Sequence, residues 1–143
     1  MSRWTILLAF AVPVLLPAVA RAQETPVDSL ALARQYTTWL YAGDVDSLRA
    51  HSTDEMAATG DYARVGQMIA ERAGVEIEVS EETWKMRNGQ CQYWRTAQFS
   101  SMEEPILIRW VLDPQGRIEG LGAGPYTQAP PVEAETCGPP AGD

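Results

Sequence analysis

The period of the apolar pattern changes at Gly74, and this change limits what the 143-residue chain can fold into more than any other feature. Between residues 28 and 73, apolar side chains recur at the spacing of one helix face. Residues 75–79 instead alternate apolar and acidic, which is typical of a half-buried strand whose apolar side chains face the core. Helices are therefore expected in the first half of the domain and strands in the second.

Capping residues and glycines divide the first half into separate helices. We expect helices from Asp28 to Gly43, over a short stretch after Asp44, from the capping box at residues 52–55 to Gly60, and from Asp61 to Gly74.

Two turn signals organise the second half. The Asn-Gly pair at 88–89 favours a two-residue hairpin between strands at 83–87 and 90–99. The Asp-Pro-Gln-Gly segment at 113–116 predicts a turn between strands at 106–112 and 117–124. Helices followed by an antiparallel meander predict an α+β domain with the helices on one face of the sheet.

The first 22 residues have the three parts of a secretory signal peptide. A short positive start precedes an apolar stretch from Trp4 to Ala20, and a small-x-small site ends at Ala22. The apolar stretch contains two prolines and is shorter than the ~20 residues that a membrane-spanning helix needs. We therefore predict a periplasmic or secreted protein, cleaved after Ala22, without a membrane anchor. A short linker at residues 23–27 follows.

Cleavage makes the chain more acidic. It removes two of the 11 basic residues and none of the 19 acidic ones, so the formal charge changes from −8 to −10. Such a chain repels nucleic-acid phosphates and anionic lipids, so neither is expected as a partner. We interpret the charge as a feature of solubility.

Cys91 and Cys137 are the two cysteines, and both remain after cleavage. Two thiols in an oxidising compartment most often form a disulfide. Their spacing is not that of a redox CxxC pair, and His51 is the single histidine, so no metal site and no cofactor is predicted. A disulfide would strap the Pro-rich tail at residues 126–143 back along the sheet.

The order of these elements resembles a known superfamily. A first helix carrying Trp39 and ending at Gly43, further helices, and a meander closing on the segment LDPQGRIEGL at 112–121 resemble the nuclear transport factor-like cone fold. That superfamily includes ketosteroid isomerase, SnoaL-like cyclases and scytalone dehydratase, and the chain is most similar to its small exported members of unknown function. The resemblance, over residues 28–125, implies a curved sheet around the first helix, with the last two strands at its centre. It also implies one open mouth suited to a small apolar ligand.

Seven residues are candidates for lining this cavity. The more apolar face of the strand at 90–99 is assigned inward, which places Arg95 inside the cone or at its rim. A desolvated guanidinium needs partners, and an internal salt bridge is favoured over a ligand carboxylate. Regularly spaced aromatics are more often core than cavity lining. The candidates are Tyr36, Trp39, Leu40, Tyr62, Tyr93, Arg95 and Trp110.

The opposite face of the sheet is expected to be buried as well. Leu107, Val111 and Trp94 point outward on their strands. The resemblance implies a homodimer through this face, and the C-terminal tail is the alternative cover.

Catalytic groups are harder to find. An isomerase needs a carboxylate base inside the cone beside an oxyanion donor. Tyr36 and Tyr62 are available donors, but the acids lie in caps, turns and outward strand positions, with Glu119 ambiguous. A dehydratase needs a His–Asp pair, for which His51 and Asp54 are the candidates, at a helix end where a capping or solvated His is commoner.

No catalytic residue is carried over from the enzymatic relatives. The sequence therefore favours an exported binding domain for a small apolar or amphipathic ligand, or a protein-interaction module. The alternative is a small isomerase, dehydratase or hydrolase-like enzyme of the same superfamily.

Overall fold

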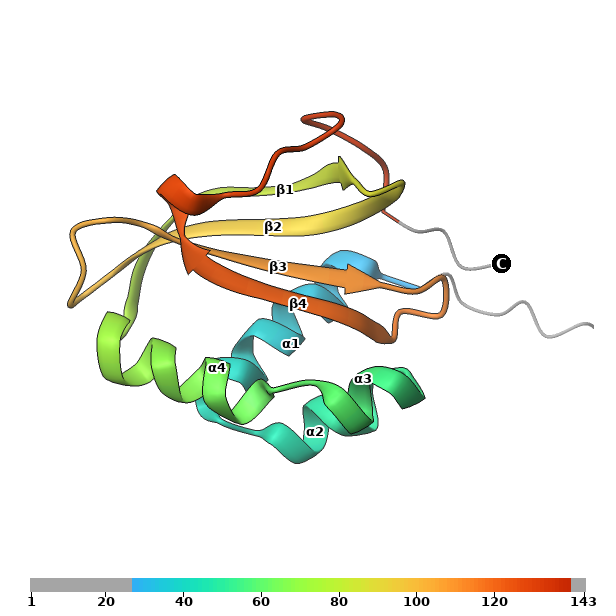
Figure 1. The fold of residues 1–143 in the computed structure, drawn as a ribbon, viewed down its shortest axis with the longest axis horizontal. Coiled ribbons are helices and arrows are strands. Elements are labelled where there is room, and N and C mark those ends of the chain that lie inside the picture. Colours follow the sequence, from blue (N-terminus) through green and yellow to red (C-terminus); the bar gives the residue numbers. More distant parts are fainter. Residues whose placement is uncertain (1–26, 140–143) are drawn as a thin grey trace, which may run out of the picture.

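The structure is a computed structural model that describes residues 27–139. The predicted signal peptide at 1–22 and most of the linker at 23–27 lie outside the described residues. Helices come first and a four-stranded antiparallel sheet follows, so the chain is α+β, as predicted (Figure 1). The elements are α1 (Ser29–Ala42), α2 (Val45–Ala50), α3 (Asp54–Thr59), α4 (Tyr62–Met68), η1 (Ile69–Ala73), β1 (Glu76–Arg87), β2 (Gln90–Phe99), β3 (Ile106–Leu112), β4 (Ile118–Pro125) and η2 (Tyr126–Gln128).

Side-chain caps confirm where three of the helices begin, but the capping box predicted at 52–55 is wrong, because Thr53 rather than Ser52 caps α3 and the Ser52 hydroxyl donates to the Leu48 carbonyl instead. Asp28, Asp44, Thr53 and Asp61 each accept a hydrogen bond from a backbone N–H three residues further along. Gly43 ends α1 in the left-handed conformation, with a φ of 70°. Within residues 27–139, no helix combines the length and apolar character required to cross a membrane.

The sheet is a simple meander in the order β1-β2-β3-β4. Both residues of the 88–89 turn have positive φ, as the predicted two-residue hairpin requires. Gly116 closes the β3–β4 turn with a φ of 80°. The expectation that the last two strands form the centre of the sheet is wrong. The centre is β2 and β3, and the two edge strands are β1 and β4. On its outer side, β4 forms an isolated bridge between Ile118 and Ser52 and pairs with no further strand in the described part of the chain.

The inward assignment of the apolar residues at 75–79 is also wrong. Val75 and Ile77 are 71% and 65% exposed, whereas the Glu76 carboxylate contacts Arg95. β1 continues from here to residue 87, with register shifts between Glu76 and Glu78 and between residues 79 and 81. Alternation fixes the direction of a side chain only while the register holds, so these shifts overturn the pattern.

The helices cover one face of the sheet, and the main core lies between them (Figure 1). Beyond β4 the chain runs back across the sheet to the outer edge of β1 (Figure 1). There Met86 donates to the Ala134 carbonyl at 2.9 Å, and Cys137 N donates to the Trp84 carbonyl at 3.0 Å. The predicted disulfide between Cys91 and Cys137 is formed, so the tail is strapped and covers part of an edge strand.

Candidate functional site

Most of the predicted cavity residues are packing residues. Five of them have exposed fractions of 1% or less, and Trp39 packs against the same core. They fill the space between the helices and the sheet and line none of the pockets described below. The five are Tyr36, Leu40, Tyr62, Tyr93 and Trp110.

The two hydroxyls considered as oxyanion donors already have partners. Tyr36 donates to the Gly116 carbonyl at 2.6 Å, and the Tyr62 hydroxyl lies 2.6 Å from that of Ser52. Burial, with a smaller contribution from Asp113, raises the pKa of Tyr36 to about 12. Both groups therefore hold the fold together rather than face an open cavity.

Arg95 forms the internal salt bridge that was favoured, and its partners lie on β1. Its Nη2 is 2.5 Å from Glu76 Oε1, and its Nη1 is 2.7 Å from Glu82 Oε2. Tyr41 donates to Glu76 Oε2 at 2.7 Å. Burial opposes ionisation of Glu76, but the hydrogen bonds from Arg95 and Tyr41 outweigh it and lower the pKa of this carboxyl below its usual value.

These residues line a polar cleft of about 410 Å³ between α1 and β1. Arg34 closes its other side and pairs with Glu82 at 2.6 Å. Two carboxylates thus face two guanidiniums, and their charges balance. The cleft contains acids, but both are committed to ion pairs, so neither is free to act as a base.

The other catalytic candidates are not brought together. His51 Nδ1 lies 2.9 Å from the Ser47 carbonyl oxygen, and the centre of its ring lies 4.8 Å from the centre of the Trp39 ring. No hydrogen bond or ion pair joins His51 to Asp54 in the described part of the chain. Glu119 is exposed and accepts a hydrogen bond from Gln90 at 2.9 Å.

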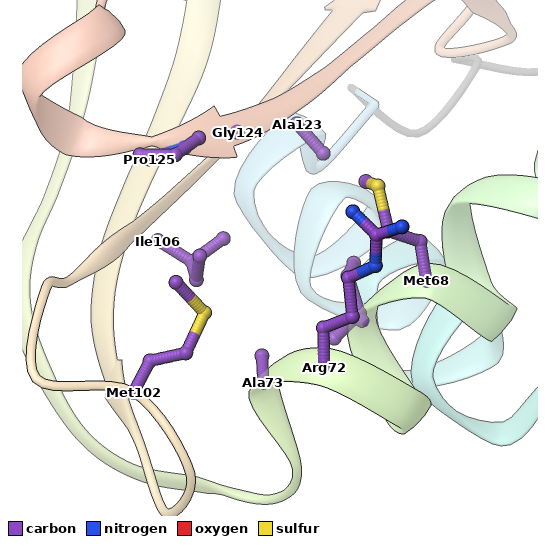
Figure 2. Close-up of a pocket in the computed structure, with 9 residues that line it drawn as sticks. Met68, Arg72, Ala73, Met102, Ile106, Ala123, Gly124 and Pro125 are labelled. Atoms are coloured by element: carbon purple, nitrogen blue, oxygen red, sulfur yellow. The ribbon is translucent and has the colours of Figure 1, made fainter.

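An apolar pocket of about 150 Å³ lies elsewhere, between η1 and the ends of β3 and β4 (Figure 2). Two half-buried methionines face it from different elements, Met68 at the end of α4 and Met102 in the β2–β3 loop. Methionine side chains adapt their shape to what they contact, and methionines are common on promiscuous binding surfaces. The lining residues are Met68, Ile69, Arg72, Ala73, Met102, Ile106, Ala123, Gly124 and Pro125.

Arg72 is the one charged residue of this lining. Its side chain rises from η1 toward Ala123, beside Met68 and across the pocket from Ile106 (Figure 2). It is exposed and forms no ion pair or hydrogen bond with any residue between 27 and 139. The pocket therefore combines an apolar interior with a cation at its rim that is available to a ligand.

Sequence reasoning missed this pocket. Its wall at Ile69–Ala73 is a π-helix, closed by a hydrogen bond from Gly74 N to the Ile69 carbonyl at 3.0 Å. Such wide turns recur at functional sites, but the pattern from Asp61 to Gly74 predicts one regular helix. The available signal was the i, i+4 pair Met68 and Arg72, which one helix face brings together.

The outer face of the sheet is buried in part within the single chain, where Val111 is half-buried and two other predicted outward residues are fully buried. Trp94 and Leu107 are each 3% exposed, although they lie on the face away from the helices. The Trp94 ring lies between the Lys85 ammonium at 5.3 Å and the Arg109 guanidinium at 5.5 Å. Two tail residues line a small pocket with Leu107 and Arg109. The tail thus contributes the cover that was one alternative, and a homodimer through this face stays a prediction.

Across residues 27–139, no three side chains among His, Cys, Asp and Glu are grouped so that they could hold a metal ion. No protein-family model matches the chain, and comparison with curated proteins and with solved structures gives no significant match.

Proposed function

We propose that this chain is an exported, non-catalytic binding domain of the cone-fold superfamily. Its apolar pocket would take the hydrocarbon end of a small ligand with a negatively charged head. One observation carries the proposal: an apolar pocket with an unpaired guanidinium, that of Arg72, at its rim.

Export is supported by two independent features. The first 22 residues have the composition of a cleavable signal peptide. The Cys91–Cys137 disulfide fits an oxidising compartment such as the periplasm or the extracellular medium.

The size of the pocket limits what it can hold. An apolar cavity of about 150 Å³ is large enough for a benzene-sized group. Each methylene that a ligand buries there contributes ~0.8 kcal/mol, or about fourfold in affinity. A short alkyl or small ring fits these limits, with the rest of the ligand outside.

The rim determines the preferred head group. An exposed ion pair with Arg72 contributes ~0.2–1 kcal/mol, which is up to about fivefold in affinity. Charge at the rim therefore selects among ligands that share a hydrocarbon end, while burial provides most of the affinity.

The enzymatic alternative is less favoured by the same geometry. Tyr36 and Tyr62 donate or share their hydroxyl hydrogen bonds within the core. Glu76 and Glu82 are paired with Arg95. The pocket beside Arg72 has no carboxylate, histidine or hydroxyl side chain in its lining.

The test compares three probes with the same six-carbon chain: hexanoate, 1-hexanol and hexylammonium. In calorimetric titration of the mature protein, the affinity should be highest for hexanoate, lower for 1-hexanol and lowest for hexylammonium. Arg72→Gln should lower the affinity for hexanoate by about two- to fivefold and leave the affinity for 1-hexanol unchanged. Ala123→Met, which fills the pocket from β4, should weaken all three probes.

Two matched variants serve as controls. Arg49→Gln removes an exposed charge from α2, and Ala63→Met adds the same side chain to an exposed position of α4. Neither should change binding. Equal affinities for the three probes, or binding that survives Ala123→Met, would contradict the proposal.

A further inference from the structure

The outer edge of β1 is covered along only part of its length. Near the C-terminal end of the strand, Met86 forms an isolated antiparallel bridge with Ala134 of the tail, and the Trp84 carbonyl accepts a hydrogen bond from Cys137 N. Within residues 27–139, no backbone hydrogen bond joins residues 76–83 to any segment other than β2. An edge strand in this state presents N–H and C=O groups that can pair with another extended segment.

Apolar side chains are exposed along the same uncovered stretch. Val75, Ile77 and Val79 are 71%, 65% and 38% exposed, and they are three of the four large apolar side chains that are exposed within residues 27–139. Single exposed apolar residues are ordinary on a protein surface. A row of three beside a free strand edge is instead typical of a surface that another chain covers.

Two clefts lie beside this edge on the side that the helices cover. The polar cleft between α1 and β1 adjoins a second pocket of about 430 Å³, because Tyr41 and Glu76 line both. The second pocket is mainly apolar, and its lining includes Ile69, Val75 and Phe99. A strand added to β1 would therefore find space for apolar side chains on this face.

The charges of β1 limit which segment can pair there. Four of the seven residues from 76 to 82 are glutamates, and those at 76, 81 and 82 are paired with Arg95 or Lys85. The Glu78 carboxylate is exposed and has no hydrogen bond or ion pair within residues 27–139. Like charges opposite each other destabilise a strand pair, so a second copy of this acidic edge is a poor partner.

The tail shows how the covered half of this edge combines backbone pairing with charge. Ala134 pairs with Met86, and the next tail residue, Glu135, forms an ion pair with Lys85 of β1 at 2.8 Å. On the uncovered half, the charge without a partner is the carboxylate of Glu78. The matching side chain of an added strand is therefore basic.

We propose that residues 75–82 bind an extended segment of another protein, one that alternates apolar and basic side chains, as an added strand of the sheet. Backbone hydrogen bonds to β1 would hold the segment. Its apolar side chains would enter the clefts that Val75 and Val79 line. Its basic side chains would lie on the opposite face with Glu78, because adjacent residues of a strand point to opposite faces. No residue of β1 lines the pocket beside Arg72, so this inference does not rest on the proposed function.

Peptides of seven residues test the site, with backbone amide NMR of the mature protein at constant ionic strength as the readout. A capped peptide that alternates lysine and valine should give saturable shifts at residues 75–82. The Trp110 Nε1–H, which donates to Thr37 Oγ1 at 2.9 Å, should not move. The absence of saturable shifts at residues 75–82 would overturn the proposal.

Two matched peptides separate backbone pairing from charge. One carries glutamate in place of each lysine and should bind more weakly, because it meets Glu78 with a like charge. The other is N-methylated at its three central residues, which keeps every side chain and charge but removes backbone donors, and it should also bind more weakly. Equal affinity of the N-methylated peptide would contradict strand addition.

Variants at exposed positions test the same contacts from the side of the protein. Glu78→Lys should lower the affinity for the lysine peptide by about threefold or more and raise the affinity for the glutamate peptide. Glu55→Lys makes the same charge change at an exposed position of α3 and should leave both affinities nearly unchanged. Ile77→Ser should lower the affinity for the lysine peptide by about fivefold, whereas Tyr126→Ser, at another exposed position, should not. Equal effects of Glu78→Lys and Glu55→Lys would contradict the site.

A titration of the protein alone distinguishes a second copy from a different partner. On concentrating the mature protein without peptide, the signals of residues 75–82 should stay in place. Shifts at these residues that grow with protein concentration would show that a second copy occupies the edge, and they would overturn the proposal.

Discussion

The Tyr36 hydroxyl donates a hydrogen bond to the carbonyl oxygen of Gly116, 80 residues further along the chain, at 2.6 Å. Tyr36 is 1% exposed on α1, and Gly116 closes the turn between β3 and β4. This contact joins the first helix to the last hairpin. It uses the hydroxyl that would otherwise have been a candidate for catalysis.

Removing this hydroxyl should destabilise the fold. Tyr36→Phe leaves the buried Gly116 carbonyl without its donor, so the free energy of unfolding should fall by ~1–3 kcal/mol. Urea denaturation measures the change. Tyr126→Phe, at a residue that is 43% exposed, should have almost no effect. A loss of equal size in both variants would show that the contact does not matter.

The same residue should make the protein sensitive to alkali. The pKa of Tyr36 is about 12 in the folded chain against 10.0 for a free side chain. Its contribution to stability is therefore complete below about pH 10 and is lost as the pH rises toward 12. The free energy of unfolding should fall over that interval by about 2–3 kcal/mol for this group, and the fall should be smaller in Tyr36→Phe. Identical alkaline profiles would refute this assignment.

The lowered pKa of Glu76 predicts that the protein loses stability in acid. Because its pKa is lowered in the folded state, its contribution is present above about pH 4.5 and is lost as the pH falls through the folded-state value. Glu76→Gln should unfold more easily at neutral pH and should lose less stability on acidification. Glu78→Gln, at an exposed neighbour, is the matched control. Thermal melts from neutral to acidic pH distinguish the two variants.

The disulfide should contribute substantially to stability. It closes a loop across a sequence separation of 46 residues, for which chain entropy gives about 4 kcal/mol. Replacing both Cys91 and Cys137 by serine should lower the unfolding free energy by roughly that amount. The tail should also become sensitive to protease before the rest of the chain does, because the strap at the β1 edge is released.

Release of the tail also bears on self-association. Gln128 and Pro130 of the tail lie beside the buried Leu107 on the outer face, so we expect a homodimer through this face to need the tail to move. Sedimentation of the oxidised protein should give the monomer mass, and the cysteine-free variant should associate more strongly. A dimer of equal strength in both forms would place the interface on another surface.

Local chemistry accounts for what could be predicted from the sequence. The caps at Asp28 and Asp61, the end of α1 at Gly43 and the turn at 88–89 each depend on a few adjacent residues. The α+β order and the Cys91–Cys137 bond follow from the order of such elements and from the cysteine count. These parts of the fold need no knowledge of the packing between distant segments.

The site depends on the packing of distant segments, and this explains why it was missed. The apolar pocket takes residues from α4, η1, the β2–β3 loop, β3 and β4, and its wall is a π-helix. The pairing of Arg95 was predictable from desolvation alone. Its partner Glu76 was not, because register shifts in β1 decide which way that carboxylate points. Register is a property of the assembled sheet.

Methyl NMR tests the central claim, that ligands enter the pocket beside Arg72, most directly. Protein labelled at the methionine methyl groups gives signals for Met68 and Met102, which line the pocket, and for Met56 and Met86, which do not. Addition of hexanoate should shift the first two signals in a saturable way and leave the second two in place. Unchanged Met68 and Met102 signals at saturating hexanoate, or equal shifts at all four methionines, would contradict the account.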